Sequence, residues 1–180
     1  MPLEIYTDGS SYNKIRDGGY GWVAVRRDKA HDWDCPVDSW SHKSTDVIIA
    51  EGSGAKPQGT SSNNDMELAG IQHSLEWLRH NQEHAEGQRV ILFTDSSYAR
   101  KCLTEWVIGW RKTGWVTMTG EPIKNQRRIK WTFARLKQVR DAGVDLAIKN
   151  IKGHRHYWNE YADRLAGEAR RRTSETNVPK

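Results

Sequence analysis

The sequence predicts an α/β fold: a mixed five-stranded sheet, made of an antiparallel meander plus parallel strands, with helices on both faces. Three observations predict it: five short apolar, β-branched runs, the close succession of the first three, and the alternation of the last two with helical patterns. Consecutive strands favour antiparallel pairing, and strands separated by helices favour parallel pairing. The 180 residues suit one domain with a core of its own.

The first half of the chain supplies the meander. We expect strands at Leu3–Thr7, Gly18–Val25 and Asp46–Ala50. Arg26–Thr45 is polar and is predicted to be a long loop or an extended hairpin. Gly52–Ser62 is rich in Gly, Ser and Thr and is predicted to be a loop.

The second half alternates helices and strands. Apolar residues recur at helical spacing in Asp65–His80, and Val90–Thr94 is an apolar strand followed by a helix that begins near Ser96. The remaining predicted elements are a helix at Arg127–Ala142, a strand at Leu146–Ile151 and a helix at Glu160–Arg172. We therefore expect one domain over residues 1–172 and a flexible tail over residues 173–180.

Composition narrows the class of protein. A net charge of +5 and a pI near 9.2 favour a polyanionic partner. Cys35 and Cys102 offer no disulfide framework, which favours a reducing compartment. The N-terminal residues lack the regions of a signal peptide, and no apolar stretch approaches the length of a membrane span. We expect a cytoplasmic monomer without membrane association or an obligate protein partner.

Four acidic residues stand in distinctive local contexts. Asp8 and Asp95 each follow an apolar strand directly, which places a side chain at the edge of a crevice. Glu67 lies in the first predicted helix and Asp163 in the last. Two unit charges about 4 Å apart repel by about 4 kcal/mol at an effective dielectric near 20, so a convergent cluster needs a counter-charge. Carboxylate oxygens suit Mg²⁺, and two such ions can drive phosphodiester hydrolysis.

Each of these acidic residues also has a structural alternative. Asp8-Gly9 suits a turn, and Asp95 with the serine after it suits a helix cap. Asn64 and Glu67 fit a capping box, in which two residues satisfy each other's backbone donors. Asp163 could be one more solvated helix residue.

Several motifs, in this order, resemble those of ribonuclease H of the cellular type 1 kind. The resemblance spans roughly Leu3 to Arg170. The motifs are Tyr6-Thr7-Asp8-Gly9-Ser10, Gly18-Gly19-Tyr20-Gly21, Asn63-Asn64-x-Met66-Glu67-Leu68, Thr94-Asp95-Ser96-x-Tyr98, Lys152-Gly153-His154 and Asn159-Glu160-x-x-Asp163.

The resemblance implies a ribonuclease H-like fold and an endoribonuclease that hydrolyses the RNA strand of RNA·DNA hybrids. It implies that Asp8, Glu67, Asp95 and Asp163 are catalytic and bind two Mg²⁺ ions, with Mn²⁺ as a substitute. It also implies that His154 assists proton transfer or product release, and that the products carry 5′-phosphate and 3′-hydroxyl ends.

A basic, Trp-rich segment is the first candidate for substrate binding. Trp106 and Trp110 share a helical face, and the cations Arg111 and Lys112 adjoin them before Trp115. The cations suit a phosphate backbone and Trp115 suits packing on sugars or bases. The segment resembles the basic protrusion, or handle, with which cellular ribonucleases H contact the DNA strand. For Trp106, packing in a helix core is the alternative to substrate contact.

Short polar side chains are further candidates for reading the substrate. Asn63 and Asn64 match family residues that recognise the RNA strand, and Asn125 matches one that contacts the DNA strand. A short amide can reach the 2′-hydroxyl in the minor groove, although turn formation is the alternative. Asn13 stands one position from a family contact residue, and Ser97 stands where glutamine is frequent.

Two other functions compete with the hybrid nuclease. A related metal-dependent DNA nuclease or resolvase would use a similar sheet and carboxylates, because one fold serves several chemistries. The asparagines and the basic segment argue against it. The second competing function is a non-catalytic hybrid-binding module. The complete set of four acidic residues argues against it.

Overall fold

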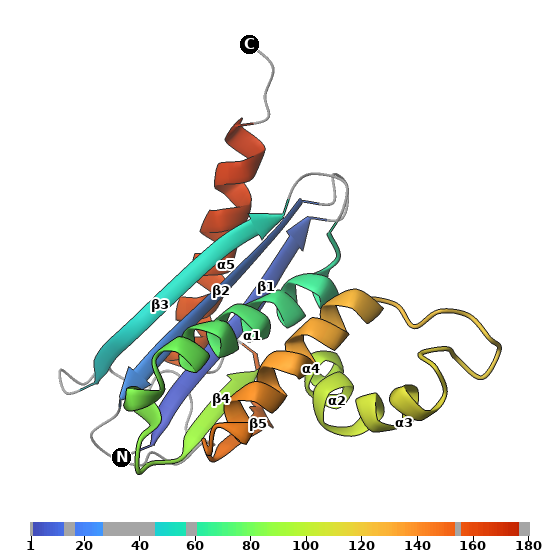
Figure 1. Cartoon of the computed structure of the whole chain (residues 1–180). Coiled ribbons are helices and arrows are strands. Elements are labelled where there is room, and N and C mark those ends of the chain that lie inside the picture. The colour runs from blue at the N-terminus through green and yellow to red at the C-terminus, as the bar shows by residue number, and fades with distance from the viewer. Residues whose placement is uncertain (1, 13–16, 27–45, 57–60, 154–155, 177–180) are drawn as a thin grey trace.

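The protein, here as a computed structural model, is described at residues 2–12, 17–26, 46–56, 61–153 and 156–176. Its strands form one sheet (Figure 1). They are β1 (Leu3–Tyr12), β2 (Asp17–Arg26), β3 (Val47–Lys56), β4 (Val90–Thr94) and β5 (Leu146–Asn150). The α-helices are α1 (Asn63–His80), α2 (Ser97–Lys101), α3 (Val107–Lys112), α4 (Gln126–Asp141) and α5 (Tyr157–Thr176). A 3₁₀ turn occupies Gln82–Ala85, and a π-helical turn at Cys102–Trp106 joins α2 to α3.

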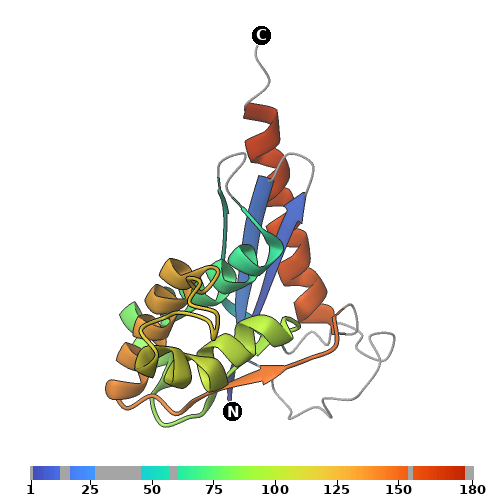
Figure 2. The same ribbon diagram turned by 90° about the vertical axis from the view of Figure 1, so that its right-hand side faces the viewer.

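The sheet has the predicted topology. Its strand order is β3-β2-β1-β4-β5, in which β2 pairs antiparallel with β3 and β1, while β4 pairs parallel with β1 and β5. Helices α1 and α4 cover one face and α5 covers the other (Figures 1 and 2). The mixed five-stranded sheet with helices on both faces is therefore confirmed.

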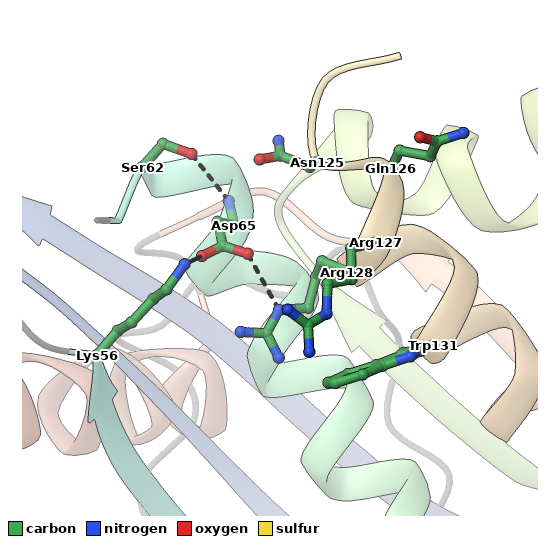
Figure 3. A pocket seen from close by; sticks show the side chains of 8 residues that line it. All are labelled: Lys56, Ser62, Asp65, Asn125, Gln126, Arg127, Arg128 and Trp131. Carbon is green, nitrogen blue, oxygen red and sulfur yellow. Dashed lines mark hydrogen bonds and ion pairs between the residues drawn. The ribbon is translucent and has the colours of Figure 1, made fainter. Parts of the chain in front are cut away.

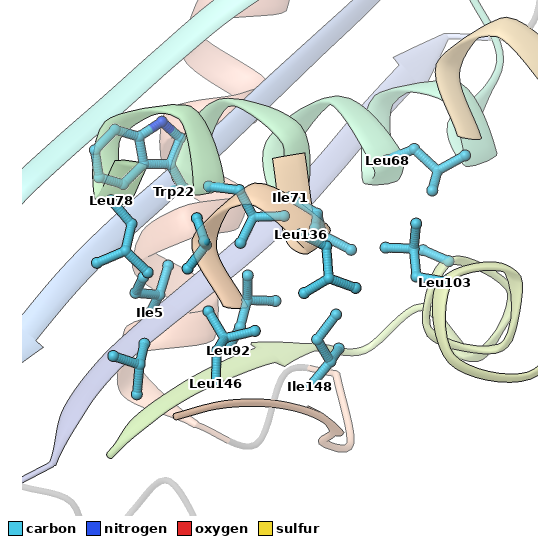
Figure 4. Close-up of a cluster of buried hydrophobic side chains, with 14 of the residues drawn as sticks. Ile5, Trp22, Leu68, Ile71, Leu78, Leu92, Leu103, Leu136, Leu146 and Ile148 are labelled. Atoms are coloured by element: carbon cyan, nitrogen blue, oxygen red, sulfur yellow. The ribbon is translucent and has the colours of Figure 1, made fainter. Parts of the chain in front are cut away.

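Alternation along the central strands creates a core on each face. Successive strand side chains point to opposite faces, so Ile5 and Leu92 enter the larger core beneath α1 and α4 (Figure 4). Their neighbours Tyr6 and Phe93 point the other way and stack at 5.0 Å between ring centroids in the core beneath α5. Burying one such side chain contributes about 1.5–3 kcal/mol. The two cores fix β1, which carries Asp8, and β4, which ends one residue before Asp95.

Strand β3 is longer than predicted, and the prediction of a loop from residue 52 onward is wrong for residues 52–56. Gly52 pairs with Trp22 and Gly54 pairs with Tyr20 on β2. A Cβ at Gly52 would lie 2.6 Å from the Trp22 indole nitrogen, and one at Gly54 would meet the Tyr20 ring. These glycines leave room for cross-strand aromatic rings, a packing role that composition alone cannot distinguish from a loop.

The first helix begins earlier than predicted. Its N-cap is Ser62, whose Oγ accepts a hydrogen bond from the Asp65 backbone N–H at 3.2 Å. The capping-box alternative for Asn64 and Glu67 is therefore wrong, and Glu67 is free of a capping role. The cap alternative for Asp95 is wrong as well, because Ser96 caps α2 by accepting from the Ala99 N–H.

The last helix also exceeds its predicted bounds at both ends, because α5 runs from Tyr157 to Thr176 instead of Glu160 to Arg172. It lies close against β2, where a Cβ at Gly21 would collide with the Ala162 carbonyl oxygen and one at Gly19 with that of Ala166. The glycine-rich start of β2 therefore lets α5 approach the sheet. Among the described residues, no helix is long and apolar enough to cross a membrane.

Candidate active site

Three carboxylates from separate elements meet at one end of the sheet. Oxygens of Asp8, Glu67 and Asp95 all lie within 4.8 Å of one another. Thr7 and Thr94 are register partners in the parallel pair β1–β4, so the next residues, Asp8 and Asp95, emerge side by side. Asp8 stays inside β1, which continues to Tyr12, so the turn alternative for Asp8 is wrong. Glu67 enters from the first turns of α1 and is buried.

Asp163 completes the acidic environment from the opposite face of the sheet. It lies on α5 next to Ala162, whose carbonyl oxygen packs against Gly21, and Gly21 pairs with Asp8 across β1 and β2. Its negative charge raises the pKa of Asp8. Asp163 lies outside the set of three oxygens within 4.8 Å, yet close enough to act on Asp8 electrostatically.

Burial and mutual repulsion hold protons on this cluster. Desolvation, followed by the charges of Asp95 and Asp163, raises the pKa of Asp8 to about 8, from an ordinary value of 3.8. Burial and then the charge of Asp8 raise the pKa of Glu67 well above its usual range. Groups that repel one another so strongly in one crevice are typical of a functional site.

The cluster has the chemistry of a divalent-cation site. Carboxylate oxygens are the ligands that hard cations prefer, and a cation would reverse the repulsion among Asp8, Glu67 and Asp95. Oε2 of Glu67 is buried and has no hydrogen-bond partner among the described residues, so it is available to coordinate a cation. The donor set therefore fits Mg²⁺ or a similar ion.

Two amides orient the ligand carboxylates. Nδ2 of Asn63 donates to Glu67 Oε1 at 3.4 Å, and Nδ2 of the buried Asn159 donates to Asp8 Oδ2 at 3.5 Å. Asn159 was not predicted as a site residue, although it lies four residues before Asp163 and so on the same helix face. Gly153 was also missed: a Cβ there would lie 2.5 Å from Asp95 Oδ2, so this backbone borders the cluster.

The other short polar candidates surround this end of the sheet. Asn63 and Asn64 are exposed at the start of α1, and Ser97 is exposed at the start of α2. Asn125 precedes α4 with φ 57°, the left-handed conformation that asparagine tolerates, and its Nδ2 donates to the Tyr98 hydroxyl at 3.3 Å. Asn13 and His154 lie outside the described residues.

The predicted handle is a projecting segment. Figure 1 shows α3 and the chain between α3 and α4 extending beyond the sheet. We call residues 106–125 the handle. Arg111 and Lys112 are exposed at its helical end, with the Arg111 guanidinium 5.8 Å from the Phe133 ring centroid on α4.

Aromatic rings attach the handle to the body of the protein. Trp106 contacts Trp110 at 5.6 Å between ring centroids, and Trp110 contacts Trp115 at 6.2 Å. Trp115 is half-buried, has φ 68° and lies beneath Lys130 of α4, so it packs inward. Trp106 is 39% exposed, which differs from the alternative of burial in a helix core.

Comparisons with known proteins agree with this architecture. The family model for RNase H matches residues 2–171. The ribonuclease H of Chromobacterium violaceum is 32% identical over 167 residues, covering 92% of each chain. That of Citrobacter koseri is 33% identical over 177 residues, covering 98% of this chain and 94% of the relative.

Solved structures share the fold at lower identity. RNase H1 from the archaeon Halobacterium salinarum superposes with a TM-score of 0.57 at 22% identity, covering 94% of this chain and 97% of that one. The foamy viral protease-reverse transcriptase in complex with an RNA/DNA hybrid gives 0.67 at 20% identity, covering 93% of this chain and 20% of that one. Family model and relatives span nearly the whole sequence, so this chain belongs to the RNase H family.

Proposed function

We propose that this ribonuclease H hydrolyses the RNA strand of RNA·DNA hybrids with two Mg²⁺ ions held by Asp8, Glu67, Asp95 and Asp163. The observation that carries the proposal is the convergence of three carboxylates, from β1, α1 and the residue after β4, within 4.8 Å, with the charge of Asp163 acting on Asp8. Bound there, Mg²⁺ would neutralise charge that builds on the phosphate and lower the pKa of a water nucleophile.

The side chains of the protein position these groups. Asn159 and Asn63 orient the carboxylates of Asp8 and Glu67 through hydrogen bonds. Water adds to the scissile phosphorus, the bond from phosphorus to the 3′ oxygen breaks, and that oxygen takes up a proton. The products then carry 5′-phosphate and 3′-hydroxyl ends. A role for His154 in moving that proton or releasing product stays a prediction.

Substrate recognition would use both sides of the cluster. Asn63 and Asn64 lie at the start of α1 beside Glu67, where they could reach the 2′-hydroxyl of the cleaved strand. Arg111 and Lys112 present exposed charge to the phosphates of the other strand, with Trp106, Trp115 and Asn125 supporting that surface. Contacts by Ser97 and Asn13, a monomeric state and a cytoplasmic location stay predictions.

One experiment separates the hybrid nuclease from its alternatives. The protein is incubated with an RNA·DNA hybrid, duplex DNA and duplex RNA, each with Mg²⁺, with Mn²⁺ or with EDTA. We expect cleavage of the hybrid's RNA strand with Mg²⁺ or Mn²⁺ and none with EDTA. Cleavage of duplex DNA would favour a DNA nuclease or resolvase, and binding without cleavage would favour a non-catalytic module. A 2′,3′-cyclic phosphate among the products would contradict the mechanism.

A further inference from the structure

A pocket of about 550 Å³ opens between the end of β3, the start of α1 and the start of α4 (Figure 3). Asp65 lines it from α1, two residues before Glu67. The pocket and the catalytic carboxylates therefore share the first turns of one helix. A nucleic-acid strand that passes the cluster could continue toward the pocket.

The pocket carries an excess of positive charge. Asp65 is its buried carboxylate, and it is paired twice: with Lys56 Nζ at 2.7 Å and with Arg128 Nε at 3.0 Å. A third cation, Arg127, has no carboxylate partner among the residues described here. Three cations against one carboxylate favour a polyanionic occupant.

Trp131 gives the pocket a flat aromatic wall. It stands one helical turn after Arg127 on α4, and the Arg127 guanidinium lies 4.5 Å from the Trp131 ring centroid. With this cation in place, Trp131 is still 50% exposed. Figure 3 shows both side chains at the side of the pocket formed by α4. We call this pair the α4 shelf.

An exposed indole with a cation beside it suits one kind of ligand. Aromatic side chains bind nucleic-acid bases by stacking, and an adjacent guanidinium adds a cation–π contribution. Bases inside a duplex already stack on one another, so a base must be unpaired to reach the ring. Stacking also reads no base identity, because every base has a π-face.

We propose that the α4 shelf binds an unpaired base of a single-stranded tail that continues from the end of the hybrid. The inference deepens the proposed function and rests on it for the hybrid substrate. It makes Trp131 and Arg127 determinants of preference for hybrids that border single strands. Paired regions would engage the carboxylate cluster and the handle without using the shelf.

The test compares the affinities of a blunt hybrid and of the same hybrid extended by six thymidines at either end of its DNA strand. Binding is measured in EDTA by fluorescence anisotropy, so that no cleavage is needed. For the wild-type protein we expect one of the tailed hybrids to bind at least about fivefold more tightly than the blunt hybrid.

Matched variants assign that preference to the shelf. Trp131→Leu keeps apolar volume but removes the π-face, so the tail's advantage should vanish, whereas Trp131→Phe should keep most of it. Arg127→Ala should reduce the advantage, and Lys137→Ala, which removes an exposed cation elsewhere on α4, should leave it intact.

The proposal is overturned if no tail strengthens binding, if Trp131→Leu keeps the preference, or if that variant weakens blunt and tailed hybrids equally. The last outcome would mean that Trp131 touches the duplex. Cleavage of the blunt hybrid in Mg²⁺ is assayed separately. Absence of cleavage with an intact tail preference would refute the proposed function and leave the shelf standing.

Discussion

The carboxylate cluster and the handle are built in opposite ways. Asp8, Glu67 and Asp95 come from three elements far apart in sequence, and two of them are buried. The handle is one continuous segment whose cations, Arg111 and Lys112, are exposed. Chemistry at one phosphate needs fixed positions, which only packing between distant elements supplies. Attraction to a regular polyanion needs charge at the surface, which a local segment can present.

The carboxylate cluster and the handle also differ in their effect on the stability of the folded protein. The cluster concentrates like charges in a buried crevice, which raises the pKa of Asp8 to about 8. The handle keeps its charges in solvent and buries the apolar parts of its aromatic rings against the body. We therefore expect substitutions in the cluster to alter both catalysis and stability, and substitutions at the handle's cations to alter substrate affinity alone.

The largest effect is expected from Asp95→Asn. The amide keeps the shape of the carboxylate and removes its charge, so cleavage should fall at least about a thousandfold, equivalent to several kcal/mol of transition-state stabilisation. Binding of the hybrid in EDTA should persist, because the handle is unchanged. Single-turnover cleavage and anisotropy measure the two properties. Cleavage near the wild-type rate would remove Asp95 from the proposed metal site.

A pair of glycine substitutions tests whether the cluster depends on long-range packing. Gly21→Ala would push its methyl group into the Ala162 carbonyl of α5, beside Asp163, and should lower stability by about 1–3 kcal/mol and also reduce cleavage. In the matched change in α3, Gly109→Ala, the added methyl group meets no atom of the described residues within 4 Å. It should stabilise the helix by about 0.5–1 kcal/mol with cleavage unchanged.

Urea unfolding and cleavage assays on both glycine variants give the comparison. Equal effects of the two substitutions would mean that the approach of α5 to β2 does not position Asp163.

The next largest difference between the carboxylate cluster and the handle is expected in the pH dependence of stability. The pKa of Asp8 is raised from 3.8 to about 8 in the folded protein, so the folded state holds a proton that the unfolded state has lost. Without metal, this group therefore destabilises the protein progressively as pH rises from about 4 to 8. Stabilisation by Mg²⁺ should be larger at pH 8.5 than at pH 5.5, because ligand carboxylates must be deprotonated.

Thermal unfolding in Mg²⁺ and in EDTA, at matched ionic strength, measures this dependence. Asp8→Asn should flatten the loss of stability with pH, whereas Arg111→Ala should follow the wild type. An identical pH profile for Asp8→Asn would contradict the assignment of the raised pKa to this cluster.

Much of this organisation was accessible from the sequence. The adjacent placement of Asp8 and Asp95 followed from apolar runs and the parallel pairing of their strands, because register fixes which residues emerge together. The predicted end of the first strand at Thr7 was wrong, because β1 continues to Tyr12. The bounds of β3 and the N-cap Ser62 did not follow. The bounds of β3 were missed because Gly52 leaves room for the indole of Trp22 on the neighbouring strand, which composition does not reveal. The N-cap was missed because Ser62, Asn63 and Asn64 are successive polar residues, each of which could cap a helix.

Long-range contacts account for the rest of what the sequence left open. Asn159 reaches Asp8 across 151 positions, and the α4 shelf needs β3 and α1 to close a pocket around it. The inward orientation of the Trp115 ring could not be predicted either, because it depends on a left-handed backbone conformation that turns the ring beneath Lys130. Local patterns carry no information about such partners.

The smallest effect is expected from removing the handle's cations. Replacing Arg111 and Lys112 with Ala should release about two fewer counterions on binding, so the slope of log affinity against log salt should flatten by roughly one to two units. KM should rise at low salt for every hybrid sequence alike, because phosphate contacts read no bases. Turnover at saturating hybrid should stay near wild type, because the lost contacts would serve ground state and transition state equally.

The matched control is Lys137→Ala with Arg135→Ala, which removes two positive charges from α4 outside the handle and keeps the net charge of the two variants equal. If the control flattens the salt slope as much as the handle variant does, the attraction comes from overall charge, and the handle is no more than a solvated projection.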